Sequence, residues 1–183
     1  MRKSEKERKT QMRLKKLAAV MMAVTMAMTI QACGKAEDTT SKQSTESVKL
    51  DAKSVKIDGN IIKIDDNIKD VMKKIGETQD VEQAKSCLYN GYDKAYKYEN
   101  YTIRTWPDGE DDYVNSIEIY ASGIEIEKAV HVGDAIETVK KVYGDNPAFD
   151  TDTYSAYEDG DYGVAFYYEN EKVNEIEIYK IEK

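Results

Sequence analysis

Two periodicities of hydrophobic residues organise the chain from residue 54 onward. The first has the helical spacing i, i+3, i+4, i+7 and comprises Ile68, Val71, Met72 and Ile75. Gly76 follows it, as expected of a residue that ends a helix with a positive φ. The same spacing recurs at Ile136, Val139 and Tyr143 before Gly144, so the sequence predicts two short helices.

The second periodicity is the alternation that is typical of β-strands. The segment Val114–Tyr120 returns as Val173–Tyr179 with one change in seven positions. In both copies isoleucines alternate with a glutamate, Glu118 in the first and Glu177 in the second. This alternation places apolar side chains on one face of a sheet and charges on the other. We therefore expect helices to cover one face of the sheet only.

Corresponding residues are separated by 68 positions at the helices (Gly76 and Gly144) and by 59 positions at the closing strands. The sequence therefore predicts an α+β fold of two tandem repeats, residues 54–121 and 122–183. Each repeat is expected to be a short helix packed on an antiparallel β-meander of three to four strands. A tight turn at 58–60 predicts a hairpin before the first helix.

Polar residues predict where these helices begin. Asp65 or Asp66 is expected to cap the first helix, and Asp134 with Glu137 has the spacing of a capping box at the second. The first repeat has nine more residues than the second between its helix and its last strand. We expect part of this excess to form a helical turn over residues 81–88.

The second helix and the residues after it resemble a known signature. Val132-Gly133-Asp134, Val139, Gly144 and Asp145-Asn146-Pro147 are similar to the helix signature of the SmpA/OmlA family of small outer-membrane lipoproteins. The tandem arrangement resembles the β-lactamase inhibitor protein family, which is built from two such units. Over residues 57–183 the resemblance implies protein–protein binding through a sheet face and loops, without catalysis. It carries over no contact residue.

Residues 1–32 have the three parts of a secretory signal: a start with eight Lys/Arg, an uncharged apolar run over 17–30, and a small residue, Ala32, at the cleavage position. Cys33 directly after it resembles the lipobox of bacterial lipoproteins. The resemblance implies cleavage before Cys33, a diacylglyceryl group on its thiol and an acyl chain such as palmitate on its amine. The alternative is an ordinary secretory signal with an incidental cysteine. Residues 33–53 are mostly polar and predict a flexible tether. We expect a cell-envelope protein, lipid-anchored on the extracytoplasmic side of the cell membrane.

Removal of residues 1–32 changes the formal net charge from −8 to −14, because that segment carries eight basic and two acidic side chains. A charge of −14 argues against binding to nucleic acid or to anionic lipid headgroups. Two interpretations remain, an acidic solvated surface or an attraction for a basic partner or cations. Cys87 is the one thiol left after lipidation, which excludes an internal disulfide, and a buried position is expected for it.

The sequence has no combination of residues that is typical of an active site. His131, the single histidine, lies in an apolar alternation and is expected to be structural. Ser-His-Asp and Cys-His sets, metal-binding histidine spacings and glycine-rich phosphate loops are not found. The acidic turns lack the spacing of a calcium loop. We expect no enzyme activity, no cofactor and no metal ion.

The functional prediction depends on the aromatic residues, because all fourteen tyrosines lie in the β-rich part of the chain. Strand parity places Arg104, Trp106, Glu118, Tyr167 and Glu177 on the face away from the helices, and these are the candidate binding residues. Large aromatic side chains ringed by polar groups favour protein interfaces. We therefore expect a module that binds a protein of the envelope or a secreted protein. The alternative is a carbohydrate or cell-wall binding module that uses exposed Trp and Tyr side chains.

Overall fold

The computed structural model describes residues 51–181. The predicted signal over 1–32, Cys33 and most of the tether over 33–53 lie outside the described residues. The helices are α2 (Ile68–Ile75) and α3 (Ile136–Tyr143). The strands are β1 (Ser54–Ile57), β2 (Asn60–Lys63), β3 (Val81–Lys85), β4 (Tyr92–Lys97), β5 (Tyr101–Asp108), β6 (Asp111–Ile119), β7 (Glu125–Ile126), β8 (Phe149–Thr151), β9 (Tyr154–Asp159), β10 (Tyr162–Glu169) and β11 (Lys172–Lys180).

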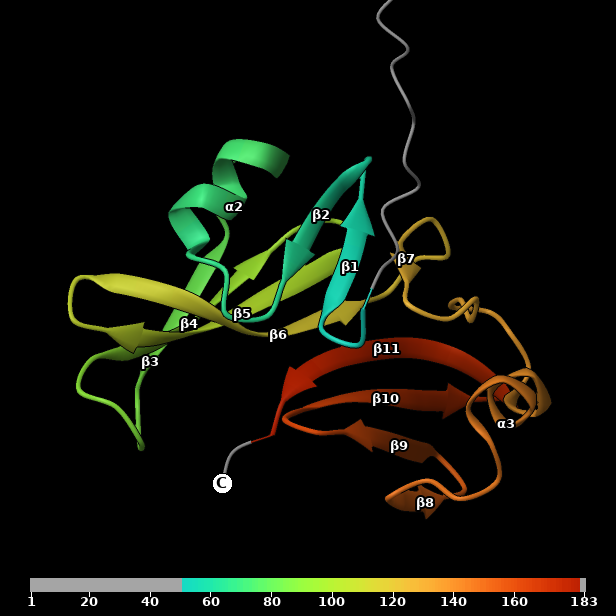
Figure 1. Ribbon diagram of the computed structural model, residues 1–183. Coiled ribbons are helices and arrows are strands. Elements are labelled where there is room, and N and C mark those ends of the chain that lie inside the picture. Colours follow the sequence, from blue (N-terminus) through green and yellow to red (C-terminus); the bar gives the residue numbers. More distant parts are fainter. Residues whose placement is uncertain (1–50, 182–183) are drawn as a thin grey trace, which may run out of the picture. The chain divides into compact units, whose positions relative to one another are not determined.

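These strands form two antiparallel sheets. The larger has the order β3-β4-β5-β6-β11-β10-β9-β8, and the smaller has the order β2-β1-β7. Figure 1 shows α2 and α3 toward opposite ends of the larger sheet, with the smaller sheet between them. The expected combination of two short helices with antiparallel meanders is confirmed, and most of the described chain is β-sheet.

The two copies of the repeated segment pair with each other at the centre of the larger sheet. Glu118 of β6 lies opposite Glu177 of β11, and the flanking isoleucines of one strand face those of the other. These four isoleucines, Ile117, Ile119, Ile176 and Ile178, are 0 to 2% exposed. Each contributes about 1.5–3 kcal/mol by burial. The sequence predicted one meander in each half of the chain, and the structure joins the two meanders edge to edge.

The hydrophobic core is one continuous cluster that receives side chains from both helices and both sheets. β1 and β2 form the predicted hairpin, in which Asp58 and Gly59 have positive φ values of 48° and 81°. β7 pairs with β1 through Val55 and Ile126, so contacts cross the predicted boundary between residues 121 and 122. All described residues belong to one compact unit of the chain.

Both predicted helices are confirmed, but the predicted caps are wrong. Neither Asp65 nor Asp66 caps α2, because the side chain of Asn67 accepts from the second helical N–H at 2.9 Å. Asp134 and Glu137 form no capping box at α3, whose N-cap is an alanine without a side-chain hydrogen bond. The carboxylates of Asp66 and Asp134 each accept instead from the backbone N–H three residues earlier, at 3.0 and 2.8 Å. These aspartates stabilise the turn before each helix rather than the helix itself.

The helical turn expected over residues 81–88 is also wrong. Val81–Lys85 form β3, which pairs with β4 at the edge of the larger sheet, and all five residues are exposed. A helix of this length is stable only when an apolar stripe packs on the core. Val81, Ala84 and Leu88 have helical spacing, but none of them belongs to the core cluster. The open edge of β4 instead supplies backbone hydrogen-bond partners directly.

Candidate binding face

The five candidate binding residues lie on the face of the larger sheet that is turned away from the helices. Strand alternation places Arg104 and Trp106 there on β5, Glu118 on β6, Glu177 on β11 and Tyr167 on β10, between residues that are buried on the opposite side. We call this surface the exposed face. The structure brings four of the five residues together as two hydrogen-bonded pairs, Arg104 with Glu118 and Tyr167 with Glu177, on neighbouring strands. Trp106 lies two residues beyond Arg104 on the same strand.

The two hydrogen-bonded pairs are centred on carboxylates that lie opposite each other on neighbouring strands. Arg104 Nε donates to Glu118 Oε1, and the Tyr120 hydroxyl donates to Glu118 Oε2 at 2.6 Å. The Tyr167 hydroxyl donates to Glu177 Oε2 at 3.1 Å. Like charges directly across a strand pair are destabilising. The three donors offset that repulsion and hold both carboxylates in place.

The centre of the exposed face has more negative than positive charge. Burial, followed by the nearby charges of Glu118 and Glu177, raises the pKa of Glu175 above its usual value. Burial and then the bond to Glu118 raise the pKa of Tyr120 to about 12. This hydroxyl therefore remains a donor at neutral pH. A single guanidinium, Arg104, lies among three carboxylates, which favours a positively charged group on a partner.

Trp106 is half-buried by other aromatic side chains rather than freely exposed. The ring centroids of Tyr89 and Tyr113 lie 4.8 and 5.4 Å from that of Trp106, and Lys180 Nζ lies 5.3 Å from it. The indole is not part of the core cluster among residues 51–181. Its Nε1 is buried and has no hydrogen-bond partner there, and the same holds for Thr105 Oγ1. A buried polar group without a partner costs about 1–3 kcal/mol.

Two hollows mark the exposed face on either side of Arg104. A cavity of about 380 Å³, which we call the Trp106 cavity, is lined by Trp106, Thr105, Leu88 and Tyr89 among others. A second cavity, of about 390 Å³, shares Arg104 and continues along the sheet toward β8 and β9. Cavities of this size accommodate side chains or small ligands.

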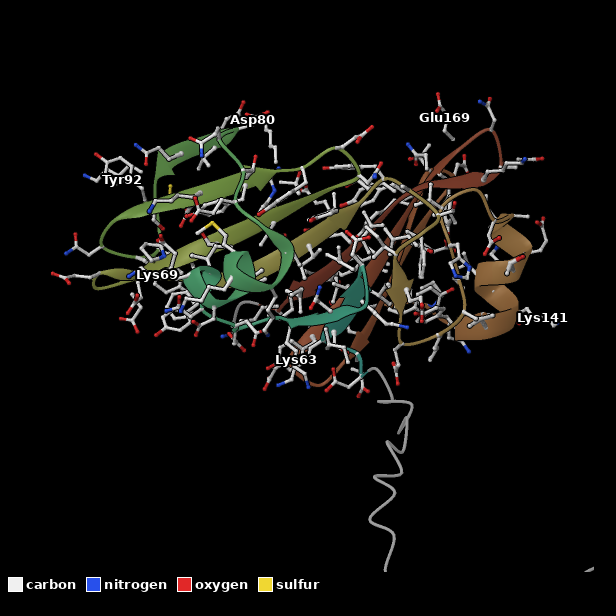
Figure 2. All side chains as sticks on the ribbon, turned by 90° about the horizontal axis from the view of Figure 1, so that it is seen from above. Lys63, Lys69, Asp80, Tyr92, Lys141 and Glu169 are labelled. Atoms are coloured by element: carbon white, nitrogen blue, oxygen red, sulfur yellow. The ribbon has the colours of Figure 1, made fainter. Side chains whose placement is uncertain are left out.

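The margin of the sheet beside the Trp106 cavity exposes apolar side chains. Leu88 is 66% and Tyr92 is 52% exposed, and β3 presents an unpaired strand edge. Figure 2 shows Asp80 and Tyr92 at this margin, at the opposite end from Lys141 of α3. Cys87 also lies here and is exposed, so the expectation of a buried thiol is wrong.

The sequence analysis missed this margin as part of the candidate site. Leu88 and Tyr92 are four positions apart and Tyr89 and Tyr92 three, which is helical spacing, so periodicity assigns them to no face of a strand. The sequence signal that could have identified these residues is their apolar character within an otherwise polar segment.

The other chemical expectations concern metals, membranes and the single histidine. Within residues 51–181, no cluster of three or more His, Cys, Asp or Glu side chains is placed to hold a metal ion. In the same range, neither helix has the length and apolar character needed to cross a membrane. His131 Nδ1 lies 3.7 Å from Asp134 Oδ2, in the turn before α3.

No family model, curated protein or solved structure matches this chain. The resemblance to the SmpA/OmlA and β-lactamase inhibitor protein families stays a prediction.

Proposed function

We propose that this protein is a binding module of the cell envelope that recognises a protein partner through the exposed face and the adjoining β3 edge. The observation that carries the proposal is the side chain of Trp106, which lines an open cavity and has a buried indole N–H without an acceptor among the described residues. A partner that places a carbonyl or carboxylate in this cavity, with a shift of the side chains that cover the indole N–H, gains a hydrogen bond and relieves the cost of the unpaired donor.

A protein suits this surface better than a carbohydrate because β3 provides an unpaired strand edge. An extended segment can add to such an edge through backbone hydrogen bonds, while its side chains enter neighbouring pockets. The Trp106 cavity is lined by residues of β3 and β4 and therefore lies within reach of such a segment. The carboxylates around Arg104 favour a basic side chain farther along the partner.

We further propose that the binding face is formed by two tandem repeats. Equivalent hydrogen bonds support this reading, because Tyr98 donates to the carbonyl of Gly76 at 2.9 Å and Tyr157 to that of Gly144 at 3.0 Å. The turn before each helix also pairs with the corresponding closing strand. Asp65 N donates to Val114 O at 2.9 Å in the first half, and Gly133 N donates to Val173 O at 2.7 Å in the second.

The repeat relation accounts for the position of the opposing glutamates. Glu118 and Glu177 are separated by the repeat offset of 59 and also lie opposite each other. Two equivalent strands that pair in this way are related by a local twofold axis through the pair. The proposed domains remain residues 54–121 and 122–183, preceded by the signal over 1–32 and the tether over 33–53.

For the location, we propose that Cys33 is the lipidated N-terminus of the mature protein. The support is the succession of a basic start, an apolar run and Ala32-Cys33. A tether of about 20 flexible residues spans roughly 25 Å on average, which separates the folded unit from the bilayer. Binding rather than catalysis is the proposed activity, with no cofactor.

The test is affinity capture from detergent-solubilised envelopes with the full chain, comparing the native protein with Trp106→Ala. The expected result is one stoichiometric protein that is retained by the native chain and lost in the variant. Tyr98→Ala is the matched control, because Tyr98 is also a partly buried aromatic side chain but lies on the helix-covered face, where its hydroxyl donates to Gly76 O. Equal loss of the partner in both variants would show that the partner does not bind at the exposed face. Retention on a glycan array that requires Trp106 would favour the carbohydrate alternative.

A further inference from the structure

A cavity of about 540 Å³ lies beside the C-terminal end of α3, and among the described residues Glu158 is the one lining residue that it shares with a cavity of the exposed face. Its walls come from α3 and the loop that follows, from the β9–β10 hairpin, and from the segment after β7. Its volume is within the range of small-molecule sites. The side chains that decide its chemistry are Glu127, Lys128, Tyr143, Tyr157, Glu158 and Asp159.

Aromatic rings form one wall of this cavity. The rings of Tyr143 and Tyr157 lie 5.1 Å apart, and Tyr143 also contacts Phe166 of the core edge-on at 5.0 Å. The hydroxyl of Tyr157 is engaged with the carbonyl of Gly144. Packing and hydrogen bonding therefore hold both rings in fixed positions in the lining of the cavity.

Carboxylates form the rim. Glu127, Glu158 and Asp159 line the cavity, and among the described residues none of their side chains forms a hydrogen bond or an ion pair. Lys128 is the one cationic side chain in the lining, so the site has an excess of negative charge. A cation at such a site is attracted by the negative charge of the carboxylates and by the quadrupole of the aromatic ring.

Lys128 shows that the aromatic wall accepts a cation. Its Nζ lies 4.2 Å from the centroid of the Tyr143 ring, although three carboxylates line the same cavity. The lysine stem is long and flexible, so the ammonium group can leave the ring at small cost when another cation takes its place. We propose that this cavity binds an organic cation, a protonated amine or a quaternary ammonium compound, in the position that Lys128 occupies.

The cavity is present because a position that holds a large side chain in the first half of the fold holds a small side chain in the second half. Tyr101 is the strand partner of Ile119, and its ring stacks on Tyr98 at 4.6 Å. The corresponding partner of Ile178 is Val164, which lies across the strand pair from Tyr157. A valine covers much less of the neighbouring tyrosine than a stacked ring does, and the space remains open. This comparison rests on the proposed repeats, whereas the cavity and its lining do not.

The test measures binding of choline, of its neutral isostere 3,3-dimethylbutan-1-ol and of butyrate to the purified full chain, by calorimetry or by shifts of tyrosine ring resonances. Choline is expected to bind about tenfold more tightly than the neutral isostere. Lys128→Gln should raise the affinity for choline about threefold or more, because it removes both the competing ammonium and its positive charge. The matched control is Lys141→Gln, the same change on α3 outside the cavity, which should leave the affinity nearly unaltered.

Filling the cavity provides the second arm of the test. Val164→Tyr places a ring beside Tyr157, as Tyr101 lies beside Tyr98, and should abolish choline binding. Should this variant not fold, Glu158→Gln serves in its place, because Glu158 is exposed and its replacement should weaken choline binding about threefold.

Three results would overturn the proposal. The first is weaker choline binding in Lys128→Gln, and the second is tighter binding of butyrate than of choline. Both would identify an anion site centred on the lysine. The third is no ammonium binding by any variant. Trp106→Ala should leave choline binding unchanged, so this site and the exposed face can fail independently.

Discussion

Replacing Trp106 by phenylalanine separates the indole N–H from the aromatic ring. The change retains a ring between Tyr89 and Tyr113 and removes a buried donor that has no acceptor among the described residues. Loss of the larger ring costs about 1 kcal/mol of packing. Removal of the unpaired donor returns about 1–3 kcal/mol. The free energy of unfolding should therefore stay the same or rise by up to about 2 kcal/mol.

The loss of stability in Trp106→Ala is the reference for the effect of Trp106→Phe. Trp106→Ala removes two aromatic contacts of about 0.5–1.5 kcal/mol each and a cation–π contact with Lys180 of about 0.5–1 kcal/mol. The expected cost is about 2–4 kcal/mol, because the return from removing the unpaired donor is offset by the apolar area of the ring that is no longer buried. For a folded unit of this size, 1 kcal/mol corresponds to a shift in melting temperature of about 3–5 °C. Trp106→Ala should thus lower the melting temperature by about 6–20 °C, whereas Trp106→Phe should not lower it.

The assay pairs thermal melting with affinity for the captured partner. If the partner supplies the acceptor for the indole, Trp106→Phe should weaken binding by about 1–3 kcal/mol, or about 5- to 150-fold, without loss of stability. Tyr113→Phe is the control, because it retains the ring that packs on Trp106 and should change binding little. A melting temperature more than about 8 °C lower in Trp106→Phe would show that the indole is a structural core group. Unchanged affinity would show that its N–H plays no part in recognition.

Three further predictions follow from particular contacts. Burial and two neighbouring carboxylates raise the pKa of Glu175 in the folded protein, so the folded state binds the proton more tightly and stability rises as the pH falls through that pKa. Glu175→Gln should therefore stabilise the protein at pH 7 by about 0.2–1 kcal/mol, and the advantage should shrink toward pH 4; denaturant unfolding at both pH values that shows no advantage at pH 7 would contradict this. Cys33→Ala should yield unprocessed or soluble protein on cell fractionation, and a variant still cleaved after Ala32 and still membrane-bound would refute lipidation at this residue. Tyr98→Phe and Tyr157→Phe should each lower the free energy of unfolding by about 0.5–1.5 kcal/mol, because each removes one hydrogen bond to a carbonyl that follows a helix; a loss in only one of them would argue against equivalent roles.

The helices and most strands of the fold were predictable because their signals are local. A stripe such as Ile68, Val71 and Ile75 defines a helical face without reference to the rest of the chain, and Gly76 ends it. Alternation in 114–120 likewise defines which side chains share a face of a strand. The placement of the candidate binding residues on one face of the sheet follows from this alternation.

The structural predictions were wrong where a residue has more than one possible set of hydrogen-bond partners. Asp66 and Asp134 have suitable positions to cap a helix, but each carboxylate accepts from a backbone N–H that the preceding turn leaves free. Residues 81–85 contribute no side chain to the core cluster, and their structure is set by the edge of β4, which is formed elsewhere in the sequence.

The features that define both candidate sites depend on long-range contacts. Pairing of β6 with β11 brings Glu118 opposite Glu177, and periodicity within each strand does not specify which strand becomes its neighbour. The rings of Tyr89 and Tyr113, which pack on Trp106, come from different parts of the chain. Side-chain period is a property of a single segment, whereas the edge that a strand joins and the space that packing leaves open are properties of the assembled chain.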